Sequence, residues 1–269
     1  MGLKKKIKKK ICSYLLKKNI FTTKKTTYLK IKDLISLVKP KKLSIDHIRL
    51  GGDNDGGYLV PNDLEGVKYC FSPGVGKITK FENEISKNNI KSFLADYSVD
   101  FKSENNLLID FEKKFLGPIS YENYICLKDW ISSKINYEKE NELILQMDIE
   151  GDEYEIINSI DIKTLKKFRI ILIEFHNMHY MLDELVYSKI YRSFELLTKY
   201  FYVSHIHPNN DTDFAIKDGD ITIPTLLEFS FIRKDRVKVI DDKLKFPHEL
   251  DQPNNPNKRD IALPDCWFK

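Results

Sequence analysis

Residues 143–157 have the sequence LILQMDIEGDEYEII, whose character changes at Asp148. Four of the five residues before Asp148 are apolar, which predicts a strand covered on both faces of a sheet. Gly151 then allows a turn, and the pattern YEII predicts the start of a helix. Acids gather at this turn, namely Asp148, Glu150, Asp152, Glu153 and Glu155. Three kinds of site place acids there: a metal site, a nucleotide-triphosphate site, or the polar edge of an α/β enzyme.

Other short apolar runs continue this pattern along the chain. Strands are predicted at residues 67–72, 90–96, 120–127, 142–150, 168–176, 200–207 and 225–233. Helical patterns separate most of them, and the longest covers residues 181–200. This alternation predicts an α/β fold with a doubly wound, mainly parallel, seven-stranded sheet and helices on both faces. No strong helix separates the last two strands, so we expect them to form an antiparallel hairpin.

Length and composition indicate a globular protein with one main domain. The chain has 269 residues, of which 42% are hydrophobic and 31% are charged. Its cysteines are far apart and include no CxxC pair; they are Cys12, Cys70, Cys126 and Cys266. This spacing indicates neither a zinc ribbon nor a disulfide framework, and it favours a reducing cytoplasm. The segment from Phe246 onward is rich in Pro and Asn, and we expect it to run extended over the domain.

The charge is distributed unevenly along the chain. Residues 1–42 contain fifteen lysines and one acid, Asp33, so they carry about +14 and leave about −10 for the remainder. We therefore divide the chain into a lysine-rich leader, residues 1–42, and a single domain, residues 43–269. The leader is expected either to lie as a helix on an anionic membrane, at its inner face, or to be a solvated helix leading into the domain.

Three other interpretations of the leader fail on its sequence. Its apolar run is too short to span a membrane or to form the core of a signal peptide. Lys6 breaks the myristoylation pattern that begins at Gly2. No nucleic-acid motif follows the lysines, and the basic charge stops where the domain begins. Nucleic acid is therefore excluded as the expected partner.

Polar residues follow the predicted strands at one edge of the sheet. In an open α/β sheet, ligands bind beyond the carboxyl ends of the strands. The polar residues and glycines at these ends are Ser72, Gly74, Gly76, Asp96, Asp148, Glu150, Glu174, His176, Asn177, His205 and His207. We expect this edge to hold the functional site.

The turn SPGVG, residues 72–76, restricts the choice of cofactor. A triphosphate site needs Gly, four residues and then Gly-Lys-Ser/Thr, but Phe71 and Ile78 occupy two of the required positions. The GxGxxG pattern of dinucleotide sites is missing as well. A single GxG turn suits S-adenosyl-L-methionine, which has no pyrophosphate. Asp96 lies twenty residues after Gly76, where a carboxylate accepts hydrogen bonds from a ribose.

Two blocks of the chain resemble a known family. LQMDIEGDEYEII (residues 145–157) is similar to the Asp-x-Glu-Gly-x-Glu block of the FkbM family of S-adenosyl-L-methionine-dependent methyltransferases. ILIEFHNMH (residues 171–179) is similar to the Glu-x-His strand that follows it in that family, and LKDWI (residues 127–131) resembles an element that precedes it. The resemblance covers roughly residues 49–233, with Gln146 as a departure where many members have Lys.

The resemblance implies a Rossmann-like class I methyltransferase that O-methylates a sugar hydroxyl, commonly in a polysaccharide, a glycolipid or a secondary metabolite. We expect the substrate to be a sugar or nucleotide-sugar used in surface polysaccharide or glycan biosynthesis. The candidate cofactor-binding residues are Asp55, Gly56, Gly57, Tyr58, Ser72, Gly74, Gly76, Glu82, Asp96, Tyr97 and Ser98.

The candidate catalytic residues are His176, Asp148 and Glu150. His176 is the expected general base, because its ordinary pKa of about 6.5 leaves it largely neutral at pH 7. Asp148 would orient His176, accept the proton itself, or bind a metal. If the enzyme uses a divalent ion such as Mg or Mn, the candidate ligands are Asp148, Glu174 and His205.

Two alternatives to a methyltransferase stay open. A metal-dependent hydrolase or glycosyl-transfer enzyme would use the same acidic strand ends and an essential ion. A non-enzymatic adaptor at a membrane surface would use the lysine-rich leader. Neither the acceptor hydroxyl nor the oligomeric state can be inferred from these residues.

Overall fold

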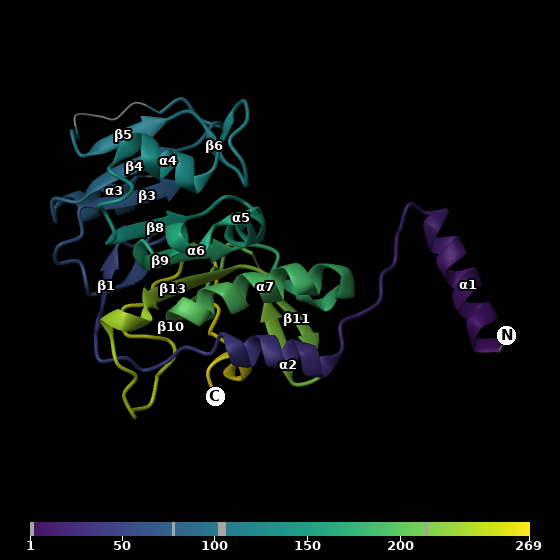
Figure 1. Ribbon diagram of the computed structural model, residues 1–269. Helices are drawn as coiled ribbons and strands as arrows, with labels where there is room; N and C mark the ends of the chain where they lie inside the picture. Colours follow the sequence, from purple (N-terminus) through teal and green to yellow (C-terminus); the bar gives the residue numbers. More distant parts are fainter. Residues whose placement is uncertain (1–2, 77–78, 102–105, 213–214) are drawn as a thin grey trace.

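One large sheet organises the structure, a computed structural model that describes residues 3–76, 79–101, 106–212 and 215–269 (Figure 1). Among these residues, seven strands form this sheet in the order β10-β13-β9-β8-β3-β4-β5. Their bounds are Phe201–Pro208 (β10), Leu227–Arg233 (β13), Phe168–Phe175 (β9), Leu143–Met147 (β8), Tyr69–Pro73 (β3), Lys91–Ala95 (β4) and Ile109–Glu112 (β5).

The directions of the strands agree with the predicted mainly parallel sheet. β3, β4, β5, β8 and β9 pair in parallel, whereas β13 is antiparallel to both β9 and β10. The antiparallel pairing of the last two predicted strands is therefore confirmed. In chain order, β4 and β5 follow β3 and lie on one side of it, and β8 and β9 come next and lie on its other side. A ligand is expected where this order reverses, beyond the carboxyl ends of β3 and β8.

Helices and short strands surround this sheet. The α-helices are α1 (Leu3–Leu16), α2 (Tyr28–Leu37), α3 (Lys80–Ser86), α4 (Leu127–Lys134), α5 (Glu153–Ser159), α6 (Ile162–Leu165) and α7 (Glu184–Tyr200), and the 3-10 turns are η1 (Met178–Leu182), η2 (Lys234–Arg236) and η3 (Asp265–Trp267). The short strands pair as β1 (His47–Leu50) with β2 (Tyr58–Pro61), β6 (Phe115–Leu116) with β7 (Tyr124–Ile125), and β11 (Ala215–Asp218) with β12 (Ile221–Pro224).

Two apolar clusters cover the two faces of the sheet. Every residue of β8 and β9 is buried, as their apolar sequences predicted. On one face, Phe71, Leu145 and Ile171 pack with α2, α4, α5, α6 and α7. On the other, Cys70 and Ile144 pack with the short helix α3 and with the hairpin β1–β2. Helices thus lie on both faces, as expected, but a β-hairpin covers part of the second one.

The prediction of a sheet strand at residues 120–127 was wrong. Only Tyr124 and Ile125 of this segment form a strand, β7, which pairs with β6 outside the main sheet, and α4 begins at Leu127. The edge position belongs instead to β5, which the sequence analysis missed. β5 has a single buried residue, Ile109, so its sequence lacks the apolar run that marks a central strand.

The leader contains two helices with different surroundings. In α2, Ile31, Leu34 and Ile35 recur at helical spacing and are buried in the main apolar cluster. The boundary expected at residue 42 therefore follows a helix that belongs to the core of the domain. α1 stands apart from the sheet (Figure 1). Among the described residues, no helix is both long and apolar enough to cross a bilayer.

The C-terminal segment closes one end of the apolar cluster. Beyond η2 the described chain forms no further α-helix or sheet strand, in keeping with the expected extended tail. Trp267 is fully buried, and its indole Nε1 donates a hydrogen bond of 2.8 Å to the carbonyl of Thr222. The tail is thus anchored at its end by one large side chain.

The burial of α2 predicts a stability difference between two leucines of the same helix. Leu34→Ala removes a side chain that is 0% exposed and should lower the free energy of unfolding by about 2 to 5 kcal/mol. Leu29→Ala changes a side chain that is 71% exposed and should alter it by no more than about 0.5 kcal/mol. Urea denaturation of both variants measures the difference. Equal effects would contradict a structural role for α2.

Candidate active site

A pocket of about 330 Å³ lies beyond the carboxyl ends of β3, β4 and β8. Its lining consists of Gly74, Gly76, Ala95, Asp96, Ser98, Phe115, Leu116, Tyr124, Asp148, Ile149, Glu150 and Asp152. The volume falls within the range of about 300–1,000 Å³ that is typical of small-molecule sites. Four expected cofactor residues, Gly74, Gly76, Asp96 and Ser98, therefore lie together at this pocket.

Glycine is required at position 74 because two strand ends meet there. The φ angle of Gly74 is +83°, and a Cβ atom on it would lie 1.5 Å from the carbonyl oxygen of Asp148. Gly76 also has a positive φ angle, +55°, but an added Cβ would meet nothing within 4 Å. Gly74 thus lets the turn after β3 contact the end of β8, whereas Gly76 leaves space at the pocket.

Asp96 closes the turn after β3 from the neighbouring strand. Its Oδ2 accepts a hydrogen bond of 3.0 Å from the backbone N–H of Gly76. Its Oδ1 accepts from the backbone N–H and the hydroxyl of Ser98, at 2.8 and 2.6 Å. Oδ1 thus uses both of its lone pairs, whereas Oδ2 keeps one for a ligand. The carboxylate is thereby fixed in orientation and is still able to accept a hydrogen bond from a ribose.

His176 follows β9 and is oriented by Glu153, which the sequence analysis did not count among the candidate site residues. The side chain of Glu153 is fully buried, and its Oε1 lies 3.0 Å from Nδ1 of His176. The same oxygen accepts hydrogen bonds from the backbone N–H groups of Ile149 and Gly151, at 3.3 and 2.9 Å. Because this oxygen is an acceptor, Nδ1 of His176 donates to it, and Nε2 keeps its lone pair.

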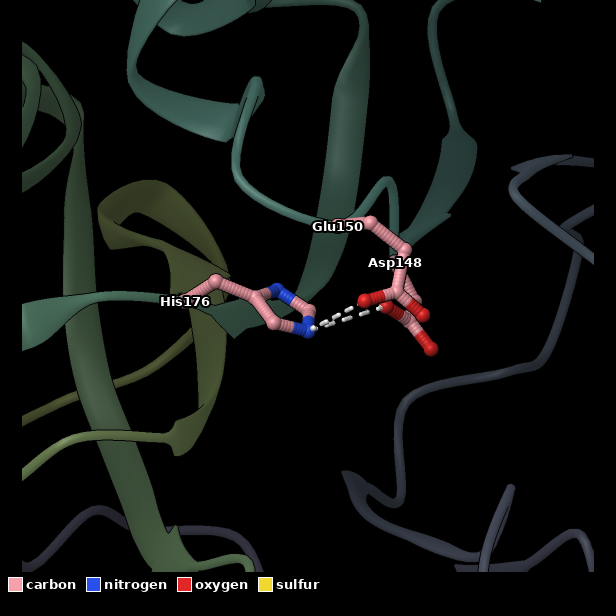
Figure 2. A group of neighbouring side chains, drawn as sticks. All are labelled: Asp148, Glu150 and His176. Carbon is pink, nitrogen blue, oxygen red and sulfur yellow. Dashed lines mark ion pairs between the residues drawn. The ribbon is translucent and has the colours of Figure 1, made fainter. Parts of the chain in front are cut away.

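Nε2 of His176 points toward two more carboxylates (Figure 2). It lies 3.8 Å from Oδ1 of Asp148 and 3.3 Å from Oε2 of Glu150. Burial alone would lower the pKa of His176, but Glu153, Asp148 and Glu150 raise it above its ordinary value. Burial raises the pKa of Asp148 to about 7, although His176 opposes this effect. Asp148 therefore changes protonation near neutral pH, and His176 holds its proton to a higher pH than an ordinary histidine does.

The backbone turns sharply on both sides of this cluster. Glu150 has φ +59° and Asn177 has φ +55°, a left-handed conformation that is uncommon for residues other than glycine. The turn after β8 and the turn after β9 adopt it side by side, since a Cβ on Gly151 would lie 3.4 Å from Nδ2 of Asn177. Such strain gathers at functional sites in many proteins.

A second group of carboxylates lies on the other side of Asp148. Glu174 of β9 is paired in register with Glu228 of β13, and both side chains are buried. Burial, together with Asp148, Glu228 and Asp55, raises the pKa of Glu174 well above its ordinary range. Burial also raises the pKa of Asp55. Asn209 and Asn254 donate hydrogen bonds to Glu174 and Glu228, at 2.9 and 2.5 Å.

The other expected cofactor residues do not line the pocket; they are Asp55, Gly56, Gly57, Tyr58, Ser72, Glu82 and Tyr97. Tyr58, Ser72 and Glu82 are instead buried around Gln146. The amide of Gln146 donates to the hydroxyl of Tyr58 at 3.2 Å, and Ser72 bonds to both Gln146 and Glu82. This network lies under the site. Burial raises the pKa of Glu82, although its hydrogen bond from Ser72 opposes this effect.

The three expected metal ligands do not come together in the structure. His205 is 3% exposed, and its Nε2 lies 2.8 Å from Asp251 in the C-terminal segment. Within the described residues, the side chains that bring ligand atoms within 4.8 Å of one another are Asp148, Glu150 and His176. A metal at this strand end would therefore use the catalytic candidates rather than Glu174 and His205.

Two features of the site were missed in the sequence. Phe115 and Leu116 of β6 and Tyr124 of β7 line the pocket, and only Tyr124 lies in the segment where a strand of the main sheet had been expected. Two-residue strands leave no periodic pattern, so no sequence signal marked them. The role of Glu153 was detectable, because the Asp-x-Glu-Gly-x-Glu block ends on it.

The chain also matches a family model. Residues 131–200 match the methyltransferase FkbM domain. This segment of the chain is thus similar to the FkbM methyltransferase domain. The matched segment includes Asp148, Glu150, Glu153 and His176, so the resemblance seen in the two blocks is confirmed. No curated protein matches the chain. Gly74, Gly76 and Asp96 lie before the matched segment, and their assignment rests on the pocket.

The raised pKa of Asp148 predicts how stability depends on pH. The folded protein holds the proton up to about pH 7, whereas an unfolded chain loses it near 3.8. Asp148 therefore favours the folded state at low pH, and this contribution is lost as pH rises through 7. Asp148→Asn cannot ionise, so its stability relative to wild type should increase by about 2 to 4 kcal/mol between pH 5 and pH 8.

Urea denaturation at the two pH values measures this change. Glu150→Gln is the matched control, because the Glu150 side chain is 86% exposed and its stability difference should vary little with pH. A difference for Asp148→Asn that stayed constant or fell with pH would contradict a buried, proton-holding Asp148.

Proposed function

We propose that the protein transfers a methyl group from S-adenosyl-L-methionine to a hydroxyl of a sugar or nucleotide-sugar, in surface polysaccharide or glycan biosynthesis. One observation carries the proposal. Asp148 and Glu150 line the pocket and also face Nε2 of His176, so a donor site and a base share the same two residues.

The pocket suits the nucleoside half of the donor. Gly76 leaves space where a Cβ would otherwise project, and Asp96 offers oriented acceptors for ribose hydroxyls. Phe115 and Tyr124 lie with ring centroids 5.6 Å apart and supply an aromatic wall for a purine. When bound, the sulfonium donor supplies an activated methyl group. The residues must hold donor and acceptor in line, which accounts for much of the rate in such transfers.

A sugar hydroxyl is a weak nucleophile at neutral pH and needs a base. Glu153 holds Nδ1 of His176, so Nε2 is the atom that would accept the hydroxyl proton while the methyl carbon bonds to the oxygen, its bond to sulfur breaks and S-adenosylhomocysteine leaves. Asp148 and Glu150 then stabilise the imidazolium cation, because each lies within 4 Å of Nε2. This arrangement gives His176 the chemical role and Glu153 a positioning role.

The surrounding carboxyl groups favour an acceptor whose reacting part is an uncharged polyol. Glu174, Glu228 and Asp55 offer oxygens that accept hydrogen bonds from hydroxyls. These carboxyl groups carry no positive charge that would pair with a phosphate. A nucleotide-sugar acceptor is therefore expected to present its sugar, not its diphosphate, to His176.

A divalent ion is the alternative means of activating the hydroxyl. Asp148, Glu150 and His176 have the ligand types that Mn accepts, and an ion there would occupy Nε2 of His176. The same atom cannot accept a proton while it binds a metal. The two routes are thus mutually exclusive, and a chelator distinguishes them.

Mass spectrometry of candidate sugars and nucleotide-sugars incubated with S-adenosyl-L-methionine and the protein tests the function. We expect a product one methyl group heavier, formed equally with and without a chelator. Asp96→Ala should raise the Kd for S-adenosyl-L-methionine about tenfold or more, because it removes the ribose acceptor. His176→Ala should leave that Kd nearly unchanged and lower kcat by about 10² to 10⁴.

Three results would reject parts of the proposal. Absence of thermal stabilisation by both S-adenosyl-L-methionine and S-adenosylhomocysteine would remove the methyl donor from the site. A Kd raised by His176→Ala and a kcat lowered only by Asp96→Ala would reverse the assigned roles. Activity that a chelator abolishes and Mn restores would favour the ion over the base.

The hydrogen bond from His176 to Glu153 predicts a change in the pH profile. Glu153→Gln removes a charge that raises the pKa of His176, so the acid limb of kcat/KM should move to lower pH. The plateau should fall about tenfold, because the amide orients Nδ1 less firmly. Glu155→Gln is the control, since Glu155 is half exposed and pairs with Lys189. An unchanged acid limb in Glu153→Gln would contradict the positioning role.

A further inference from the structure

α1 presents apolar side chains to solvent in a row. Ile7, Ile11 and Tyr14 are spaced by four and three residues, so they lie on one face of the helix. Their exposed fractions are 50%, 54% and 61%. Ile20 and Phe21, which follow the helix, are 50% and 74% exposed. A folded protein seldom leaves so many large apolar side chains together in water unless something covers them.

The domain does not cover this row. Among the described residues, the side chain of Cys12 in α1 forms a hydrogen bond with the hydroxyl of Thr22, which also belongs to the leader. The chain becomes attached to the domain only after that. The N–H of Thr26 donates to the carbonyl of Leu182, and the N–H of Glu184 donates to the carbonyl of Lys24. α1 therefore stands beyond a fixed attachment point (Figure 1).

Lysines surround the apolar row. Lys8 lies three residues before Ile11 and Lys10 lies four residues before Tyr14, so both flank the row on the helix surface. Lys6, Lys9, Lys17 and Lys18 are exposed as well. No acid occurs in the sequence before Asp33. The surface that covers α1 must therefore combine negative charge with an apolar interior.

We propose that α1 docks on an anionic lipid bilayer. Its apolar row would enter the boundary between headgroups and acyl chains, and its lysines would contact the phosphates. A nucleic acid would bind the lysines through its phosphates, but it offers no apolar surface that would cover the apolar row. A second copy of α1 would bring lysines against lysines. Residues 43–269 carry a net charge of about −10, so an anionic bilayer repels them. The attraction must therefore come from the leader.

Flotation of the full-length protein with vesicles tests the proposal. We expect binding to vesicles of phosphatidylcholine with 30% phosphatidylglycerol (a proportion of about one lipid in three) and not to phosphatidylcholine alone. Raising the NaCl concentration to about 0.5 M should weaken binding, because salt screens the lysines. Lys243→Glu, at an exposed position of the domain, should bind as wild type does.

Two aspartate variants of the same helix separate insertion from charge attraction. Ser13→Asp adds one negative charge away from the apolar row and should weaken vesicle binding about fivefold. Ile11→Asp adds the same charge within the row and should weaken it about fiftyfold or more. Both should keep the wild-type melting temperature, because the side chains of α1 that the structure describes, from Lys6 onward, do not belong to the apolar clusters.

Three results would overturn the proposal. Equal losses in the two aspartate variants would mean that α1 attracts anions without inserting. Failure of the full-length protein to float with anionic vesicles would remove the bilayer as partner. Self-association that Ile11→Asp abolishes, or RNA binding that competes with vesicles, would identify another occupant of the row.

Discussion

A single buried carboxylate holds the site together. Glu153 has no exposed side-chain surface, yet it lies at the turn between β8 and α5. Its Oε1 takes hydrogen bonds from two backbone N–H groups of that turn and from Nδ1 of His176 on the next strand. A charge at this depth is stable only when donors surround it. The turn and the imidazole are therefore fixed by one set of contacts.

The other carboxyl groups determine how much negative charge the site carries. Burial raises the pKa values of Asp148, Glu174 and Asp55, so these carboxyl groups hold their protons to a higher pH than ordinary carboxyl groups do. Protonated carboxyl groups donate as well as accept hydrogen bonds. The edge of the sheet is thus less negative than its sequence suggests, and it offers both kinds of partner to a polyol.

How much of the fold and of the site was predictable depends on how far apart in the sequence the interacting residues lie. Apolar runs such as residues 143–147 predicted the central strands, because burial on both faces requires them. Positions at strand ends predicted Gly74, Asp96 and His176, since parallel strands align their carboxyl ends. The pairing of His205 with Asp251 was not predictable, because it joins a strand to a tail without periodicity. The burial of Glu82 and Glu153 likewise depends on neighbours distant in sequence.

The contact between Gly74 and Asp148 restricts how such an enzyme diversifies. No side chain fits at residue 74, because a Cβ would overlap the carbonyl of Asp148. The turn after β3 and the strand end that faces His176 are consequently one inseparable unit. New acceptors must then be accommodated by pieces outside the sheet, such as the loop between β1 and β2 or the C-terminal tail. Lineages that share this chemistry should differ most in those peripheral segments, and a designer seeking a new acceptor should begin there.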